Sequence, residues 1–270
     1  MTVAAPPDES TRLRWRTDRF VELDGHRIPI APEVEARPPG WAGLRRQSRR
    51  TVAWKRLVWP LYHALLDATG DGFIEWEVGR LLKRHWRPGA TYLEIACGAL
   101  SLERFVPPGS WFNAFDIGLS EFHLRWTLAR SRRVNAALAD VERIPLPDAC
   151  ADVLVLTQAF GNFRNLDTAL REIRRVAKPG ARFICTVSNH HAWLYRSRTW
   201  KPRRPLPWRF AEFPEFMAER GFRFVEGHMK GFGIPAPRWL VPHILTIPVT
   251  MPREDLNIVF FYVFEVDAAP

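Results

Sequence analysis

The stretch from Thr91 to Leu100, Thr-Tyr-Leu-Glu-Ile-Ala-Cys-Gly-Ala-Leu, constrains the fold of this 270-residue chain more than any other. Its apolar run at residues 92–95 predicts a fully buried strand, and the small residues 96–99 follow it as a tight turn. Glu94 lies where the strand ends. An acid followed by a turn of small residues is typical of the ligand-binding edge of an open α/β sheet.

Two more acids end the next two expected strands. Asp116 closes a strand that begins at Trp111, about twenty residues after the turn, where an acid can accept both hydroxyls of a ribose. Asp140 follows a strand at residues 135–138, where a carboxylate can accept a hydrogen bond from the amine of adenine and Val141 can pack on the ring. Acids are also common turn and cap residues, so that role stays open for Asp140.

Four strings in this order resemble the class I S-adenosylmethionine-dependent methyltransferases, in the branch that acts mostly on small molecules. They are Leu93 to Gly98, then Asp116, then Ala139 to Asp148 with Asp152, and finally Ala169 to Gly180. The resemblance spans roughly residues 75–266. It implies a Rossmann-like three-layer αβα sandwich whose seven-stranded, mostly parallel sheet has an antiparallel last strand.

The chain departs from this family at its first turn. Glycine is usual at the positions of Ala96 and Leu100, and only the middle glycine, Gly98, is present. Alanine is a mild change if φ stays negative there, whereas leucine could crowd the methionine end of the cofactor.

The resemblance also implies a set of site residues. The cofactor, S-adenosylmethionine, would contact Glu94, Ala96, Cys97, Gly98, Asp116, Ile117, Asp140, Val141 and Gln158. The substrate pocket would include Trp76, Phe160, Asn162, Trp193 and Arg196, although each aromatic residue could instead be a core residue. A general base, if one is used, would be His190, His191 or Tyr195, and each of these could equally be structural.

The chain reads as one domain with extensions. Residues 1–50 are rich in Pro and Arg, with a possible small hairpin about Asp24-Gly25, and would form a strap on the main domain or a partly disordered arm. Residues 51–89 would supply helices that cover the active site. Residues 90–270 would form the methyltransferase domain, with lids at about 189–210 and 227–255.

Composition limits the other classes of function. The net charge is +10, but only five of the 39 basic residues are Lys, as a GC-rich genome would produce, so a nucleic-acid partner is not favoured. The three cysteines show neither metal-ligand spacing nor pairing, which predicts reduced thiols in the cytoplasm and no metal site. No signal peptide or membrane-spanning stretch is expected. A monomer or homodimer is expected.

The sequence therefore predicts methyl transfer from S-adenosylmethionine to an oxygen, nitrogen or carbon atom of a small, apolar or aromatic molecule. Two alternatives remain open at this point. The chain could be a methyltransferase-like scaffold that binds or cyclises without transfer, or it could act on a lipid-like acceptor at a membrane surface through residues 239–247. A dinucleotide cofactor is disfavoured because a single glycine follows Glu94.

Overall fold

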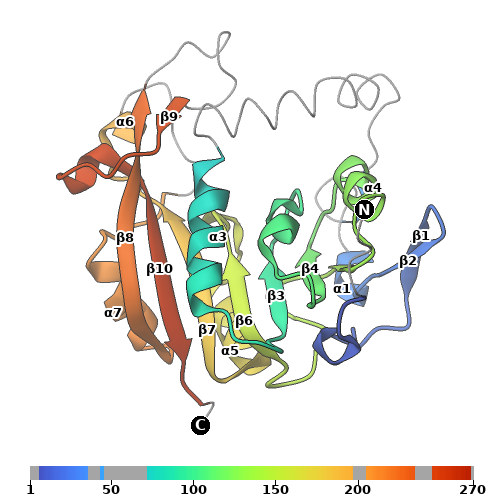
Figure 1. The fold of residues 1–270 in the computed structure, drawn as a ribbon. Helices are drawn as coiled ribbons and strands as arrows, with labels where there is room; N and C mark the ends of the chain where they lie inside the picture. The colour runs from blue at the N-terminus through green and yellow to red at the C-terminus, as the bar shows by residue number, and fades with distance from the viewer. Residues whose placement is uncertain (1–5, 36–42, 46–71, 197–204, 235–244, 269–270) are drawn as a thin grey trace.

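The computed structural model describes residues 6–35, 43–45, 72–196, 205–234 and 245–268. The helix expected from Thr51 and the proline-rich centre of the second lid lie outside these residues. The described part is built around one large sheet and a separate two-stranded hairpin, both visible in Figure 1.

The large sheet has eight strands in the order β5-β4-β3-β6-β7-β10-β8-β9. Strands β3 to β7 pair in parallel, while β10 runs antiparallel to both of its neighbours. The strands are β3 (Tyr92–Ile95), β4 (Phe112–Asp116), β5 (Val134–Leu138), β6 (Ala151–Leu156), β7 (Ala177–Ser188), β8 (Phe222–Ile234), β9 (Leu245–Ile247) and β10 (Asn257–Val266). The predicted Rossmann-like class is confirmed, with one strand more than expected because β9 pairs with β8.

The strand order reverses at β3, which fixes where a ligand can bind. The chain passes from β3 outward to β4 and β5, and then returns to β6 on the other side of β3. Ligands of open α/β sheets bind at the carboxyl ends of the strands beside such a reversal. The residues that end these strands, Ile95, Asp116 and Leu156, therefore mark the candidate site.

Strand β8 is longer than the sequence indicated. It continues to Ile234, inside residues 227–255, the segment that the sequence analysis assigned to the second lid. Here a Cβ at Gly227 would lie 3.0 Å from the Tyr262 ring of β10, so the glycine permits close packing within a continuous strand.

Helices cover the two faces of the sheet, and Figure 1 shows α3 crossing in front of it and α5 behind. The α-helices of the main domain are α3 (Phe73–His85), α4 (Glu121–Leu128), α5 (Leu166–Val176), α6 (Trp193–Arg196) and α7 (Glu212–Ala218). Four short 3-10 helices are η1 (Glu9–Thr11), η2 (Ser101–Phe105), η3 (Phe160–Asn162) and η4 (Glu254–Leu256). None of the described helices is long and apolar enough to cross a membrane.

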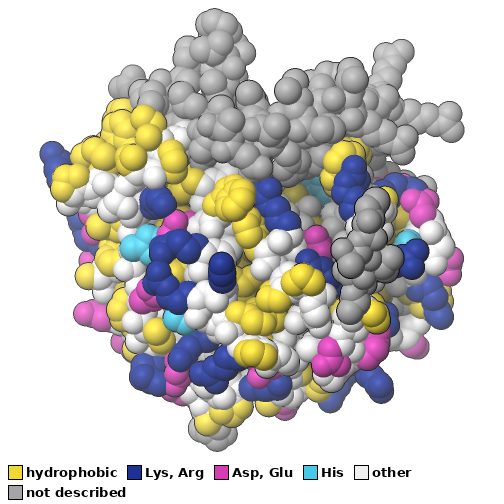
Figure 2. Space-filling model, viewed as in Figure 1, with side chains coloured by type: hydrophobic (Ala, Val, Ile, Leu, Met, Phe, Trp, Pro, Cys, Tyr) yellow, Lys and Arg dark blue, Asp and Glu magenta, His cyan; other side chains and the backbone are white. Residues whose placement is uncertain are grey.

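Helix α3 is joined to β8 by a cluster of charges. The Glu77 side chain is only 6% exposed, and its carboxylate lies 2.8 Å from Lys230 Nζ and 2.8 Å from His228 Nε2. Arg80, one turn along α3, also donates to it. Figure 2 shows basic, histidine and acidic side chains interleaved over this part of the surface. Much of the positive charge here is therefore balanced by acids across two elements.

The described part of the N-terminal extension packs on the main domain, as the strap prediction requires. Strands β1 (Phe20–Leu23) and β2 (His26–Pro29) form the expected hairpin, with positive φ at both Asp24 and Gly25. Helix α1 (Pro32–Glu35) follows. Ile30 then pairs in parallel with Leu138, so the extension lies beside the carboxyl end of β5.

Candidate functional site

The turn after β3 is built from three residues with left-handed backbone. Ala96, Gly98 and Leu100 have φ of 56°, 50° and 60°. The condition under which alanine would be a mild change, a negative φ, is therefore not met, and both non-glycine residues hold a conformation that favours glycine. The Leu100 side chain is 2% exposed and belongs to the hydrophobic core. It serves as a packing residue, so the expected crowding of an open site by this leucine is not observed.

Asp116, the last residue of β4, joins that turn to the next loop. Its Oδ2 accepts a hydrogen bond of 2.9 Å from the backbone N–H of Gly98, and its Oδ1 accepts one of 2.9 Å from Gly118. The Cys97 N–H donates to Phe115 O, 3.1 Å away, which is a second tie between the turn and β4. Each carboxylate oxygen keeps lone pairs for a further donor. The Asp116 carboxylate is thus fixed at the sheet edge and can still accept hydrogen bonds from hydroxyl groups.

Glu94 is 1% exposed and has an unusual environment for a carboxylate. Burial, reinforced by the nearby charges of Glu75 and Asp116, raises its pKa well above the ordinary value. The Tyr92 hydroxyl lies 3.4 Å from its Oε2, and burial also raises the pKa of that hydroxyl. A raised pKa favours the protonated acid, which can donate a hydrogen bond as well as accept one.

Burial likewise raises the pKa of the Cys97 thiol, which is 4% exposed. A buried thiol with a raised pKa is not a reactive thiolate. Cys97 therefore contributes backbone geometry and packing to the turn.

Asp140 organises the loop after β5. Its Oδ1 accepts the backbone N–H of Glu142 at 3.1 Å, and its Oδ2 accepts from the Arg164 guanidinium at 3.3 Å. Val141 beside it is 8% exposed. The Glu142 carboxylate, which the sequence did not single out, accepts from the N–H groups of Arg164 and Asn165. Both the turn role and the ligand role considered for Asp140 are compatible with this loop.

Gln158 begins a chain of polar contacts at the ends of β6 and β7. It has a φ of 54°, and its backbone N–H donates to Thr186 Oγ1 at 2.9 Å. Its side-chain oxygen accepts from the Ser188 hydroxyl. Burial raises the pKa of Tyr195, and the neighbouring Ser188 opposes that rise. The Tyr195 ring lies edge-on to His190, with ring centroids 5.2 Å apart. The fold thus brings Gln158, Tyr195 and His190 together.

The two candidate histidines have their ring nitrogens engaged by backbone. His190 Nδ1 accepts the Leu206 N–H at 2.6 Å, and burial with the nearby His191 lowers the His190 pKa to about 4. Neutral His190 then carries its proton on Nε2 and is a donor there. His191 Nε2 lies 2.8 Å from Pro207 O and must donate to that carbonyl. His190 is therefore not a base poised near neutral pH, and the His191 ring is held by the Pro207 carbonyl.

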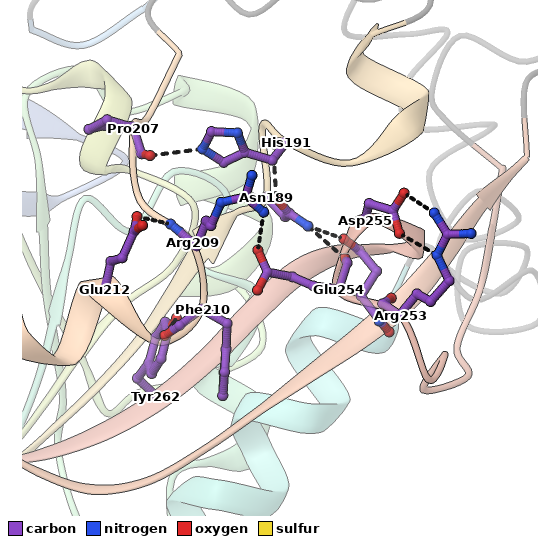
Figure 3. Close-up of polar contacts among 11 residues, drawn as sticks. Asn189, His191, Pro207, Arg209, Phe210, Glu212, Arg253, Glu254, Asp255 and Tyr262 are labelled. Atoms are coloured by element: carbon purple, nitrogen blue, oxygen red, sulfur yellow. Dashed lines mark hydrogen bonds and ion pairs between the residues drawn. The ribbon is translucent and has the colours of Figure 1, made fainter.

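Asn189, which the sequence analysis did not select, anchors this loop. Its side-chain nitrogen donates to the carbonyls of Glu254, at 2.9 Å, and Asn257, at 2.7 Å. Its side-chain oxygen accepts the N–H of His191 at 3.0 Å. Figure 3 shows Asn189 between His191 and the segment that enters β10. A buried asparagine directly after a strand was the signal that could have revealed it.

The predicted pocket residues are placed in different environments. Phe160 is 3% exposed and packs edge-on against Phe213 of α7, which is a core role. Asn162 is exposed at the end of η3. Trp76 is 54% exposed on α3, with its ring 5.2 Å from that of Phe105.

Trp193 and Arg196 lie on α6, next to the histidine loop. The Trp193 ring stacks on Phe232 at 6.2 Å, and its buried Nε1 has no hydrogen-bond acceptor within the described residues. Across those same residues, no group of three or more His, Cys, Asp or Glu side chains could hold a metal ion.

The comparisons with known proteins agree with this geometry. Residues 93–185 match the family model described as a methyltransferase domain. A ubiquinone/menaquinone biosynthesis C-methyltransferase of Caulobacter sp. (strain K31) is 52% identical over 83 residues, which cover 31% of this chain and 33% of that protein. The enzyme of the same name from Cupriavidus metallidurans is 32% identical over 150 residues, covering 52% and 58%. The chain thus spans between a third and three fifths of these two relatives.

Solved structures with the same fold are more distant in sequence. A putative methyltransferase from Bacillus halodurans superposes with a TM-score of 0.53 at 14% identity, covering 71% of this chain and 99% of that one. A chain from the complex of the Haloferax volcanii Trm112 methyltransferase activator with a putative methyltransferase gives 0.52 at 18% identity, covering 77% and 97%. Residues 93–185 are therefore similar to a methyltransferase domain, and the chain has the same fold as these two putative methyltransferases.

Proposed function

We propose that this chain transfers a methyl group from S-adenosylmethionine to a small, apolar or aromatic molecule. The observation that carries the proposal is the Asp116 carboxylate, held at the sheet edge by the N–H groups of Gly98 and Gly118. It occupies the strand end where an acid accepts hydrogen bonds from the two hydroxyls of a ribose. The match to the methyltransferase domain covers this part of the chain.

The residues around the turn fit an adenosyl amino acid. A Cβ built on Gly98 would meet no atom within 4 Å, so the turn leaves open space there. Asp116 supplies an acceptor for the ribose, and Asp140 with Val141 supplies an acceptor and an apolar contact for the base. The buried Glu94 lies near the carboxyl end of β3, and its pKa is raised by burial and by the nearby charges of Glu75 and Asp116.

The chain's own groups support alignment more than proton removal. S-adenosylmethionine supplies an activated methyl group on a sulfonium, so positioning and exclusion of water can provide about 7–11 kcal/mol of the barrier reduction. His190, with a pKa of about 4, is neutral at physiological pH and offers an N–H donor. Burial also raises the Tyr195 pKa and keeps that hydroxyl protonated. We infer that these residues orient the acceptor by donating hydrogen bonds to it.

The acceptor we propose is an aromatic ring, with carbon as the favoured nucleophile. The two relatives named above are C-methyltransferases of ubiquinone and menaquinone biosynthesis. The Nε1–H of Trp193, which has no acceptor among the described residues, suits a carbonyl or hydroxyl on such a ring. Oxygen and nitrogen acceptors remain alternatives. We place the reaction in the cytoplasm because the three cysteines are unpaired. We propose that the protein acts as a monomer or homodimer.

Calorimetry with S-adenosylhomocysteine tests the proposal. Asp116→Ala removes the carboxylate, so the affinity is expected to fall at least tenfold, by about 1.4 kcal/mol or more. Asp167→Ala, at a carboxylate that is 64% exposed on α5, is the matched control and should leave the affinity unchanged. Equal binding by Asp116→Ala and the wild type would remove the ribose assignment.

A further inference from the structure

We propose that the N-terminal extension is a clamp for the adenosine half of the cofactor, acting through Arg45 as a positioning residue. The clamp is defined as residues 30–35 and 43–45. It rests on the proposed function, because it concerns the two loops that follow β4 and β5. Those loops carry Asp116 and Asp140, the acids assigned to the ribose and the adenine.

The first contact joins residues 43–45 to the loop after β4. The Gly43 N–H donates to Ile117 O at 2.8 Å, and the Arg45 N–H donates to Leu119 O at 2.8 Å. In return, Arg45 O accepts the N–H of Glu121, the first residue of α4, at 3.2 Å. A short parallel pairing therefore begins directly after Asp116.

The Arg45 side chain adds to this pairing. Its Nε donates to Gly118 O at 3.0 Å, and Nη2 donates to the same oxygen. Gly118 is the residue whose N–H holds Asp116 Oδ1. The Arg45 guanidinium thus binds the carbonyl of Gly118, while the N–H of the same residue holds the Asp116 carboxylate.

Arg45 also completes the start of α4. The N-cap residue Ser120 makes no side-chain capping hydrogen bond, although the first N–H groups of a helix need acceptors. The carbonyl of Arg45 meets part of that need from a distant part of the chain. Loss of this contact would loosen both the loop and the first turn of the helix.

The second contact joins residues 30–35 to the loop after β5. The Ala31 N–H donates to Leu138 O at 2.8 Å, two residues before Asp140. The Glu33 carboxylate of α1 lies 2.6 Å from the guanidinium of Arg143 in the same loop. The Ala139 N–H donates to Asp116 O, so the two loops are also tied to each other. One segment of the extension therefore holds each adenosine-binding loop.

Pre-organised loops bind a ligand more tightly because less conformational entropy is lost on binding. The clamp therefore predicts that Arg45→Ala lowers the affinity for S-adenosylhomocysteine about fivefold to twentyfold. Arg45→Lys should recover part of it, because a lysine amine can still donate to Gly118 O. Arg27→Ala is the matched control, since Arg27 belongs to the same extension but stacks on the Phe20 ring of the hairpin.

The experiment combines calorimetry with hydrogen exchange on the full chain. Without any cofactor, Arg45→Ala should speed amide exchange at residues 117–121 and leave the centre of the sheet unchanged. Wild-type affinity and exchange in Arg45→Ala would overturn the clamp while leaving the proposed function intact. If the wild-type protein binds no S-adenosylhomocysteine, both the clamp and the proposed function are wrong.

Discussion

Left-handed backbone at Ala96, Gly98 and Leu100 shows how a glycine-rich turn can lose glycines and keep its shape. An L-residue in this region is disfavoured by about 1–2 kcal/mol, so the surroundings must hold it there. Leu100 is held by burial, because its side chain packs in the core and its N–H donates to Cys97 O at 2.9 Å. Ala96 is only half-buried, and its single methyl group packs at the margin of the same core.

The two positions should respond oppositely to glycine. Ala96→Gly relieves strain and removes little, so it should stabilise the protein by up to about 1 kcal/mol. Leu100→Gly relieves similar strain but deletes a buried leucine, which typically costs about 2–5 kcal/mol, so it should destabilise the protein. Urea denaturation of the two variants measures both effects. Stabilisation by Leu100→Gly would mean that the side chain does not contribute to the core.

Among elements, the contact between α3 and β8 carries the most concentrated charge. Besides the Glu77 cluster, Glu226 of β8 lies 2.6 Å from Arg84 and 2.6 Å from His85 at the other end of α3. Burial opposes the ionisation of Glu226, but His85 and Arg84 outweigh it and lower its pKa. A helix that precedes β3 is thereby fixed to a strand more than a hundred residues away in sequence.

These ion pairs should make the protein acid-sensitive. Burial opposes ionisation of Glu77 as well, but hydrogen bonds from Arg80 and Lys230 leave its pKa below the ordinary 4.5. A carboxyl with a lowered folded-state pKa stabilises the fold above about pH 4.5, and that contribution disappears as the pH falls through the lowered value. Burial lowers the His228 pKa, so stability is also lost as the pH falls below 6.5.

Glu77→Gln should therefore cost about 2–3 kcal/mol at pH 7, somewhat less than a fully buried pair because Arg80 is half exposed. The difference from wild type should stay constant down to about pH 4.5 and shrink as the pH falls further through the lowered pKa of Glu77. Thermal unfolding across this range is the measurement. Glu9→Gln removes an exposed carboxylate that pairs with Arg12, and it should change stability by less than about 0.5 kcal/mol. A Glu77→Gln effect that is constant with pH would exclude the ionic explanation.

The elements that the sequence predicted correctly depend on local residue preferences. The features that it did not predict depend on contacts between residues far apart in the chain. The Asp24-Gly25 turn was correct because both residues tolerate the required backbone. Phe160 was assigned to a pocket, but it lies in the core because α7, far along the chain, supplies Phe213. The acids at the carboxyl ends of β3 and β4, Glu94 and Asp116, follow from the strand pattern, whereas their neighbours across the sheet do not.

At the scale of the whole molecule, the described part of the N-terminal extension packs beside β4 and β5. Two buried asparagines hold it there. Asn113 of β4 accepts the Leu13 N–H at 2.9 Å and donates to Thr11 O at 2.9 Å. Asn135 of β5 donates to Leu13 O at 2.8 Å. The sequence of residues 1–50 does not predict their pairing with β4 and β5. The signal lies in the strands themselves, as the polar residues Asn113 and Asn135.

Asn113→Ala should release the extension before the rest of the protein unfolds. The change leaves the buried Leu13 N–H and Thr11 O without their partner, at a cost of about 1–3 kcal/mol for each unsatisfied group. Arg14 and Arg16 follow directly after Leu13, in the segment that the change would release. Limited trypsin digestion should therefore cut there faster than in wild type, as mass spectrometry would show. The exposed Asn162→Ala is the control and should digest like wild type. Unchanged cleavage in Asn113→Ala would mean that contacts other than these amides hold the extension on the sheet.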